Sequence, residues 1–327
     1  MFRLAMAVLV LLSLLVTGCS ARAPAPESVT IRFYDLTNVD VRDVPMLMAL
    51  DALREQGYTI EVTYMAKSAL IAEGLARGDA DIGLLNNQTM WLAIEKGADV
   101  RTVAQSVGSA TVFASKTSVT SCQQLDGRPV GLASATGVSP ALLYRYLEQE
   151  CPDVEPQYLV IPESEGRRAA MLADQLDATT MPSEELLKLQ QEAPGRFHAL
   201  MVPAEMFPEI QVEGLHVRQG WAQDHPEAVR AFLRALLEAN RRIAADPQLL
   251  YDQAEERLEL DATTVRLVAD AYLDAAIWPA NGALTSTNLQ QTIDFLTSID
   301  ELPAGLEVDD IADLSYLNAV LDEIGRR

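Results

Sequence analysis

Short apolar runs alternate with amphipathic helical segments along much of the chain. Residues 29–34 alternate apolar and polar side chains as a strand does, and Leu47, Leu50 and Leu53 then recur at helical spacing. Residues 59–65 predict the next strand. Strands that alternate with helices in this way indicate an α/β protein.

Residues 78–88 are the stretch around which we expect this first part of the chain to be organised. A helical segment, 66–77, precedes it, an apolar run at 82–85 has strand character, and Asn86 and Asn87 are the polar start of another helix. In open parallel sheets, ligands bind at the carboxyl ends of strands, beside helix N-termini. The pattern therefore predicts that Asn86 and Asn87 lie at a binding edge.

A second copy of this unit follows later in the chain. Residues 75–81 resemble residues 172–177, with one residue inserted. Each copy is followed by a short strand, at 82–85 and 178–181, and then by polar residues that open a helix. The two copies suggest two similar α/β lobes with a cleft between them.

The order of the remaining elements predicts where the lobes begin and end. A glycine–serine pair at residues 108–109 separates strands at 100–107 and 111–115 and allows a change of direction, and a strand at 212–217 returns the chain to the first lobe. From Pro226 onward the pattern is nearly all helical and predicts helices, among them 311–324, that pack around that lobe. The expected division is 29–108 with 213–327 for lobe 1, and 109–212 for lobe 2.

Residues 1–18 have the pattern of a signal segment. A positive charge precedes an apolar run at 4–16, about the length of a signal h-region. The sequence VTGC at its end resembles a bacterial lipobox, which implies cleavage before Cys19 and lipid attachment to its thiol. An ordinary signal segment with an incidental cysteine is the alternative. Residues 19–28 then form a flexible tether, so we expect a lipid-anchored protein on the extracytoplasmic face of the cell membrane.

The charge of the chain limits its partners. The formal net charge is −22, and such a surface repels nucleic acid and anionic lipid, so nucleic acid is not an expected partner. The net charge does not decide which small ligand binds, because a few local dipoles outweigh a distant field.

The two cysteines beyond Cys19 favour a disulfide, because export permits disulfides. Cys122 precedes a strand expected at 129–133, and Cys151 ends the helix that follows it. A helix that returns antiparallel to its strand brings the two cysteines together. Two separate buried thiols are the alternative. Two cysteines at this spacing do not form a zinc site, and we expect neither a metal nor a cofactor.

Four motifs occur in a recognisable order: the GDADIGLL run within residues 72–85, KGADV at 96–100, LDGRPVG at 125–131, and HPEAV at 225–229 with FLRA at 232–235. With the lipobox, they make the sequence similar to solute-binding lipoproteins of ABC importers. The similar group is related to nitrate, taurine and aliphatic-sulfonate binding proteins and to thiamine-pyrimidine-precursor binding proteins. The resemblance implies a two-lobed type II periplasmic-binding-protein fold with a hinge between the lobes and a helical C-terminal segment.

The resemblance also implies a function. A monomer would capture a small polar solute between two closing lobes, and deliver it to the permease subunits of an ABC importer. The alternatives are an enzyme of the same fold, in pyrimidine or menaquinone precursor synthesis, and a ligand-sensing subunit of a membrane receptor. We expect no enzyme, because the three histidines show no Ser–His–Asp order, metal spacing or phosphate loop. Only His216, near the expected hinge, is of interest.

Amide and hydroxyl groups at strand ends are the main candidates for ligand contact, because they donate and accept hydrogen bonds without a large desolvation cost. For each, a helix cap or a turn is the alternative role. The candidates are Thr37, Asn38, Ser68, Asn86 and Asn87 in the first lobe, and Ser134, Thr136, Gly137, Glu163 and Thr180 in the second.

The sequence leaves the charge of the ligand open. Helix openings at Asn86 and Ser134 suit an anion, and Lys67 and Arg42 are the nearest cations. Carboxylates near strand ends favour an amine or a heteroaromatic compound instead; these are Asp35, Glu163, Glu165 and Glu184. Aromatic contacts would come from Tyr34, Tyr64 or Trp91.

Overall fold

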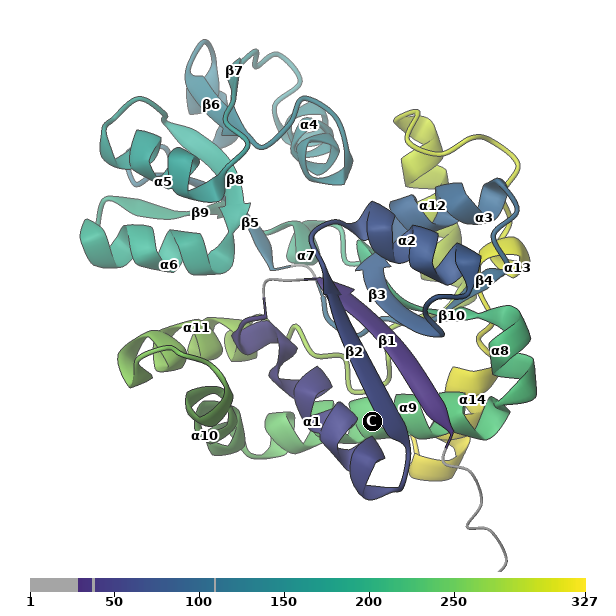
Figure 1. Ribbon diagram of the computed structural model, residues 1–327. Helices are drawn as coiled ribbons and strands as arrows, with labels where there is room; N and C mark the ends of the chain where they lie inside the picture. The colour runs from purple at the N-terminus through teal and green to yellow at the C-terminus, as the bar shows by residue number, and fades with distance from the viewer. Residues whose placement is uncertain (1–28, 37–38, 109) are drawn as a thin grey trace, which may run out of the picture.

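The computed structural model describes residues 29–36, 39–108 and 110–327, and their strands form two five-stranded sheets (Figure 1). The signal segment, the tether with Cys19, and the candidate ligand residues Thr37 and Asn38 lie outside the described residues. No helix within the described ranges is long and apolar enough to cross a membrane.

The two sheets share one topology. The first has the strand order β2-β1-β3-β10-β4 and the second has β7-β6-β8-β5-β9. In each sheet the fourth strand runs antiparallel to both neighbours and reaches its place through a crossing: β5 follows β4 along the chain, and β10 follows β9. The strands are β1 (Thr30–Leu36), β2 (Thr59–Met65), β3 (Ile82–Asn86), β4 (Val100–Ala104), β5 (Thr111–Lys116), β6 (Pro129–Leu132), β7 (Gln157–Val160), β8 (Ala178–Pro182), β9 (Phe197–Met201) and β10 (Glu213–Arg218).

Helices cover both sheets, as the alternating pattern predicts. The C-terminal helices pack on the first sheet: α9 lies beside α1 and α14 in Figure 1, and the rings of Phe33 and Phe232 meet with 5.5 Å between centroids. The helices are η1 (Val41–Asp43), α1 (Val44–Glu55), α2 (Ser68–Arg77), α3 (Asn87–Glu95), η2 (Cys122–Leu125), α4 (Val138–Glu150), α5 (Ser164–Leu172), α6 (Ser183–Glu192), α7 (Pro203–Met206), α8 (Gln219–Asp224), α9 (Pro226–Ala245), α10 (Pro247–Arg257), α11 (Ala262–Asp274), α12 (Ser286–Ser298), α13 (Val308–Ile311) and α14 (Ser315–Ile324).

The internal repeat of the sequence has a structural counterpart in two buried or half-buried aspartates. Asp81, just before β3, pairs with Arg32 of β1 at 2.5 Å and with Arg218 of β10 at 3.2 Å. Asp177, just before β8, pairs with Lys116 of β5 at 2.8 Å and lies 3.5 Å from Arg128. Asp81 therefore links β1 to β10 in the first sheet, and Asp177 links the residue before β6 to β5 in the second.

Two expected elements differ from the structure, and pairing across the fold explains both. The strand expected at 100–107 ends at Ala104, because the backbone N–H of Gln105 donates to Gly282 instead of a sheet neighbour. The helix expected at 311–324 is divided into α13 and α14, because Ala312 bridges to Thr102 of β4 and interrupts the helix.

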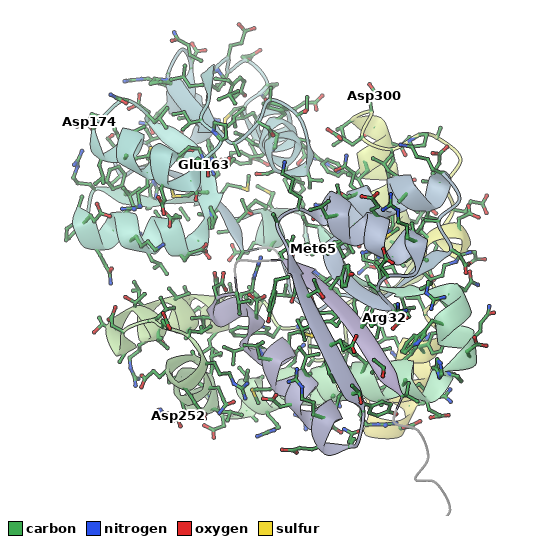
Figure 2. All side chains as sticks on the ribbon, in the orientation of Figure 1. Arg32, Met65, Glu163, Asp174, Asp252 and Asp300 are labelled. Atoms are coloured by element: carbon green, nitrogen blue, oxygen red, sulfur yellow. A yellow bond between two sulfur atoms is a disulfide. The ribbon has the colours of Figure 1, made fainter. Side chains whose placement is uncertain are left out.

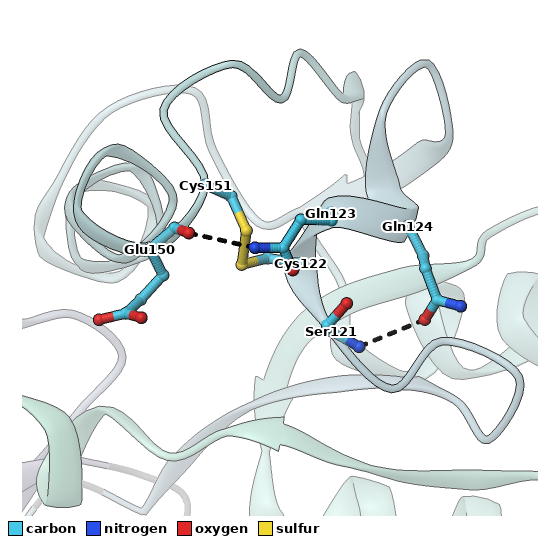
Figure 3. Close-up of a disulfide and its surroundings, with 6 residues drawn as sticks. All are labelled: Ser121, Cys122, Gln123, Gln124, Glu150 and Cys151. Atoms are coloured by element: carbon cyan, nitrogen blue, oxygen red, sulfur yellow. Dashed lines mark hydrogen bonds between the residues drawn. A yellow bond between two sulfur atoms is a disulfide. The ribbon is translucent and has the colours of Figure 1, made fainter.

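Cys122 and Cys151 are bonded to each other, with a Cα–Cα separation of 6.1 Å (Figure 3). The bridge joins η2 to the residue that ends α4, and Gln123 donates a further hydrogen bond to the carbonyl of Glu150. Both sulfur-bearing side chains are buried. The bridge therefore fixes the C-terminal end of α4 relative to the second sheet and leaves the N-terminal end of this helix unconstrained.

Candidate functional site

A small hollow lies at the carboxyl end of β1 in the first sheet. Asp35, Arg42, Asp43 and Glu213 line it, together with Leu36, Leu84 and Leu85. Its volume is about 10 Å³, which is about the room that one water molecule needs. The hollow therefore combines four charged side chains with a space for one small group.

Asp35 is the buried acid of this hollow. Side chains alternate between the faces of a strand, so Asp35 shares a face of β1 with the core residues Ile31 and Phe33, and it is 7% exposed. One carboxylate oxygen accepts a hydrogen bond of 2.8 Å from the backbone N–H of Leu36. Burial, and then the charge of Asp43, raise the pKa of Asp35 to about 8.

Arg42 is the cation of the hollow, and its charge is shared by two other acids. Its guanidinium lies 3.9 Å from Asp43 and 3.7 Å from Glu213. Burial opposes the charge on Arg42, but Glu213 and Asp43 outweigh burial and raise its pKa. Burial also raises the pKa of Asp43, against the effect of Arg42. No ion pair joins Arg42 to Asp35 within the part of the chain that the structure describes.

A hydrogen bond joins α11, in the C-terminal segment, to α6, beside the second sheet. The hydroxyl of Tyr272, on α11, donates to the carboxylate of Glu184 at the start of α6, at 2.9 Å. Burial raises the pKa of Glu184. Glu184, a carboxylate expected near a strand end, thus contacts a helix of the C-terminal segment.

A second and larger cavity, of about 940 Å³, lies between α4 and α12. The N-terminal turn of α4 lines it through Thr136 and Gly137, two of the candidate residues. Gly137 precedes the helix with φ of 101°, a backbone conformation that glycine adopts without strain. Arg145 also lines the cavity, and its guanidinium lies over the rings of Phe207 and Phe295 at 5.3 and 5.4 Å. The volume is in the range of small-molecule sites.

The structure brings three candidate residues together at the end of β3. The backbone N–H of Asn86 lies 3.5 Å from the hydroxyl of Ser68, and the side chain of Asn86 caps α3 by accepting from Thr89. Asn87 is fully buried, and its amide donates to the carbonyl of Gln211 at 2.9 Å. Asn86 therefore acts as a helix cap, and Asn87 holds the segment that leads into β10.

The candidates of the second sheet lie apart from this group. The hydroxyl of Ser134 donates to the carbonyl of Thr136 in the turn before α4. Glu163 is exposed and precedes α5 without capping it, whereas Thr180 is buried within β8. Figure 2 shows Glu163 in the half of the molecule that holds the second sheet, and Met65 at the carboxyl end of β2 near the middle.

Arg167, on α5, lies at the ends of β7 and β8 and is not among the site residues that the sequence predicts. It is 4% exposed, and its guanidinium donates to the carbonyls of Thr180, Ile161 and Pro162 at 2.8, 2.6 and 2.7 Å. It therefore fixes the ends of β7 and β8 relative to each other. Nothing in the sequence distinguishes Arg167 from its neighbour Arg168, which pairs with Glu185 of α6.

Each of the three histidines contacts other residues of the fold. His216 is fully buried in β10, and one ring nitrogen lies 3.0 Å from the hydroxyl of Thr102. His198 contacts the carbonyl of Val119, and the ring of His225 packs on that of Trp221. None of the three lines either of the two cavities described above.

Several solved structures with the same fold are described as solute-binding proteins. The periplasmic aliphatic sulphonate binding protein SsuA of Escherichia coli is 18% identical, with 88% of this chain and 92% of that chain covered and a TM-score of 0.68. A putative periplasmic sulfonate-binding protein of Methylobacillus flagellatus KT is 16% identical, with coverage of 91% and 95% and a TM-score of 0.71. The periplasmic nitrate-binding protein NrtA of Synechocystis PCC 6803 is 12% identical, with coverage of 92% and 90% and a TM-score of 0.65.

These similarities confirm the two-lobed periplasmic-binding-protein fold that the sequence predicts, which is the fold of the solute-binding components of ABC import systems. The comparison with curated protein sequences gave no match. The family model described as NMT1/THI5 like matches residues 53–249, which is more than half of the chain. The protein belongs to the NMT1/THI5-like family.

Proposed function

We propose that the protein is the extracytoplasmic substrate-binding component of an ABC importer. It acts as a monomer, captures a small polar solute between its two lobes and delivers it to the permease subunits. The lobes are residues 29–108 with 213–327, and residues 109–212. The observation that carries this proposal is the shared topology of the two sheets, which exchange one strand each way through chain crossings. Such connections act as hinges about which two lobes close on a ligand.

The cavity between α4 and α12 supports a role in binding. Thr136 and Gly137 present the N-terminal turn of α4 to it, while Phe295 comes from the C-terminal segment that packs on the first sheet. The cavity therefore lies where elements associated with both sheets face each other. The solved structures of sulfonate- and nitrate-binding proteins have the same fold, and a binding role fits histidines that are occupied in structural contacts.

A solute screen tests the proposal. The full-length protein, purified in detergent, is melted with nitrate, sulfonates, taurine, pyrimidines, amino acids and polyamines. A solute that binds only the folded state raises the melting temperature by mass action. Small-angle X-ray scattering then measures whether the bound protein becomes more compact. A screen without a binder, together with no small molecule released on denaturation, would contradict a solute-binding role.

Lipid anchoring through Cys19 is part of the same proposal. The Cys19→Ala variant removes the thiol that would carry the lipid, and we expect it to leave the membrane fraction for the soluble extracytoplasmic fraction. Fractionation and immunoblotting measure this shift, with a Ser20→Ala variant as the control. Retention of Cys19→Ala in the membrane fraction would show that Cys19 is not the anchor.

A further inference from the structure

Asp35 is a buried acid without an ion-pair partner among the described residues. It is 7% exposed, continues the core face of β1 and lines the hollow. Its single hydrogen bond among the described residues comes from the adjacent Leu36, and only one of its two oxygens takes part. Because a buried carboxylate without a close partner is costly, Asp35 holds a proton up to about pH 8. A cation placed against Asp35 would favour its ionised form.

The hollow in front of Asp35 accepts one small group. Its volume of about 10 Å³ suits a water-sized group. An ammonium group is of that size, whereas a sulfonate, with three oxygens around its sulfur, is much larger. The hollow therefore has room for one small charged group of a ligand and not for the rest of the ligand.

The charges around the hollow disfavour an anion. Three carboxylates line it, from Asp35, Asp43 and Glu213, and the single guanidinium of Arg42 is already in range of two of them. An anion that entered would meet three acidic side chains and one cation. A cation would meet the one carboxylate that Arg42 does not pair with.

Tyr64 lies beside Asp35. The two residues are register partners on the adjacent parallel strands β2 and β1. Burial, and after it the charges of Asp35 and Asp43, raise the pKa of Tyr64, which shows that its hydroxyl senses these acids. Tyr64 is nevertheless 41% exposed. An exposed aromatic ring next to a buried carboxylate is a setting in which ammonium groups bind, because the ring face attracts cations.

We infer that the solute of this protein carries an ammonium group, which sits in the hollow against the carboxylate of Asp35 with Tyr64 at its side. This inference rests on the proposed function and names the class of solute that the cleft takes. The sulfonate- and nitrate-binding proteins that share the fold would then differ from this protein in the charge of their ligand.

Binding of small probes to the full-length protein tests the inference. Methylammonium and putrescine are compared with ethanesulfonate and nitrate at equal ionic strength, by thermal shift and by isothermal titration calorimetry. We expect the two ammonium probes to raise the melting temperature and the two anions to leave it unchanged. In the Asp35→Asn variant the ammonium probes should bind about tenfold more weakly or worse, because the carboxylate partner is gone.

Matched variants separate a binding role from a structural one. Asp79→Asn removes an exposed acid at the opposite end of β3 and should bind the ammonium probes as the unmodified protein does. Tyr64→Ala should weaken ammonium binding, whereas Tyr64→Phe, which keeps the ring, should restore it. Circular dichroism checks that Asp35→Asn is folded, and asparagine retains an oxygen that accepts from Leu36.

Two results would overturn the inference. One is an anion that binds equally well to Asp35→Asn and to the unmodified protein; the solute-binding function would then stand and its ligand would be anionic. The other is a lack of binding by both ammonium probes, or binding that Asp35→Asn leaves unchanged. The proposed function itself fails only if the wider solute screen is empty as well.

Discussion

At the scale of single residues, Asp35 is the point where β1 departs from its own pattern. The alternation places Ile31 and Phe33 in the core, and the next position on that face holds a carboxylate. Burial raises its pKa from 3.8 to about 8. Between these values the folded protein keeps a proton that the unfolded chain has lost. The contribution of Asp35 to the free energy of unfolding therefore falls as the pH rises from about 4 to about 8.

The Asp35→Asn variant should lose this dependence. We expect it to melt at a higher temperature than the unmodified protein at pH 8.5, because a neutral amide does not carry the cost of a buried charge. The difference should shrink as the pH approaches 4. A weaker dependence of the melting temperature on pH should remain in this variant, since burial also raises the pKa of Asp43, beside Arg42 and Glu213. Thermal unfolding followed by circular dichroism from pH 4 to 9 measures the effect.

Asp79→Asn is the control for this comparison, because Asp79 is exposed. Parallel pH profiles for Asp35→Asn and the unmodified protein would contradict a buried, protonated Asp35. A greater stability of Asp35→Asn at every pH, by the same amount, would also contradict it, since packing and not ionisation would then be responsible.

The sequence predicted some site residues and could not predict others. Asn86 and Ser68 were identified because a strand end followed by a helix start is visible in the local pattern, and the structure places them together. The hollow depends on Glu213, which reaches β1 only because β10 joins the first sheet from far along the chain. Arg167 is likewise defined by carbonyls of two strand ends. Such long-range contacts leave no local periodicity to detect.

At the scale of elements, β10 is held by a chain of polar side chains inside the first sheet. The indole of Trp91 donates to the hydroxyl of Thr102 at 2.9 Å, and this hydroxyl lies 3.0 Å from Nδ1 of His216. The imidazole is fully buried, which favours its neutral form. Burial lowers the pKa of His216 to about 3.

The neutral state of His216 predicts a loss of stability in acid. The unfolded chain binds a proton at this histidine near pH 6.5, whereas the folded protein does so only near pH 3. The contribution of His216 to the free energy of unfolding should therefore decrease as the pH falls below about 6.5. The His216→Asn variant, which does not titrate, should show a smaller decrease between pH 7 and 4.5, whatever its absolute stability. Urea midpoints at several pH values measure this slope.

His225→Asn provides the matched control, because that ring packs on the surface helix α8 through Trp221. An acid-induced loss that is equal in His216→Asn and in the unmodified protein would show that other groups are responsible. The Asp35 effect has the opposite sign, so the two effects offset each other between about pH 4 and 6.5 in the unmodified protein. Each single variant should therefore show the other group's slope, and the double variant Asp35→Asn/His216→Asn should show neither.

The elements themselves were largely predictable, because strands and helices alternate with clear periodicity. The strands expected at 111–115 and 212–217 correspond to β5 and β10. The sequence pattern does not separate α10 from α9, although Asp246 caps α10 by accepting from Gln248. The exchange of β5 and β10 between sheets was suggested by the crossings, but their antiparallel pairing depends on neighbours distant in sequence.

At the scale of the whole molecule, the surface charge and the inferred ligand act together. The formal net charge of −22 produces a negative potential that extends about 30 Å at 0.01 M salt and about 8 Å at 0.15 M. An ammonium solute is attracted by this field before it reaches the cleft. The ion pair that the ammonium group forms with Asp35 is buried. Salt therefore screens this pair much less than it screens the approach of the solute.

Salt should therefore slow the binding of an ammonium solute without speeding its release. Between about 0.01 and 0.3 M salt, we expect the association rate constant for putrescine to fall several-fold and the dissociation rate constant to change little. Stopped-flow measurement of protein fluorescence gives both constants, and a neutral polyol such as sucrose, at equal osmolality, controls for the effect of added solute. An association rate that is independent of salt would show that the acidic surface does not guide the ligand. A dissociation rate that rises steeply with salt would place the ammonium group in an exposed ion pair, which contradicts its position against a buried Asp35.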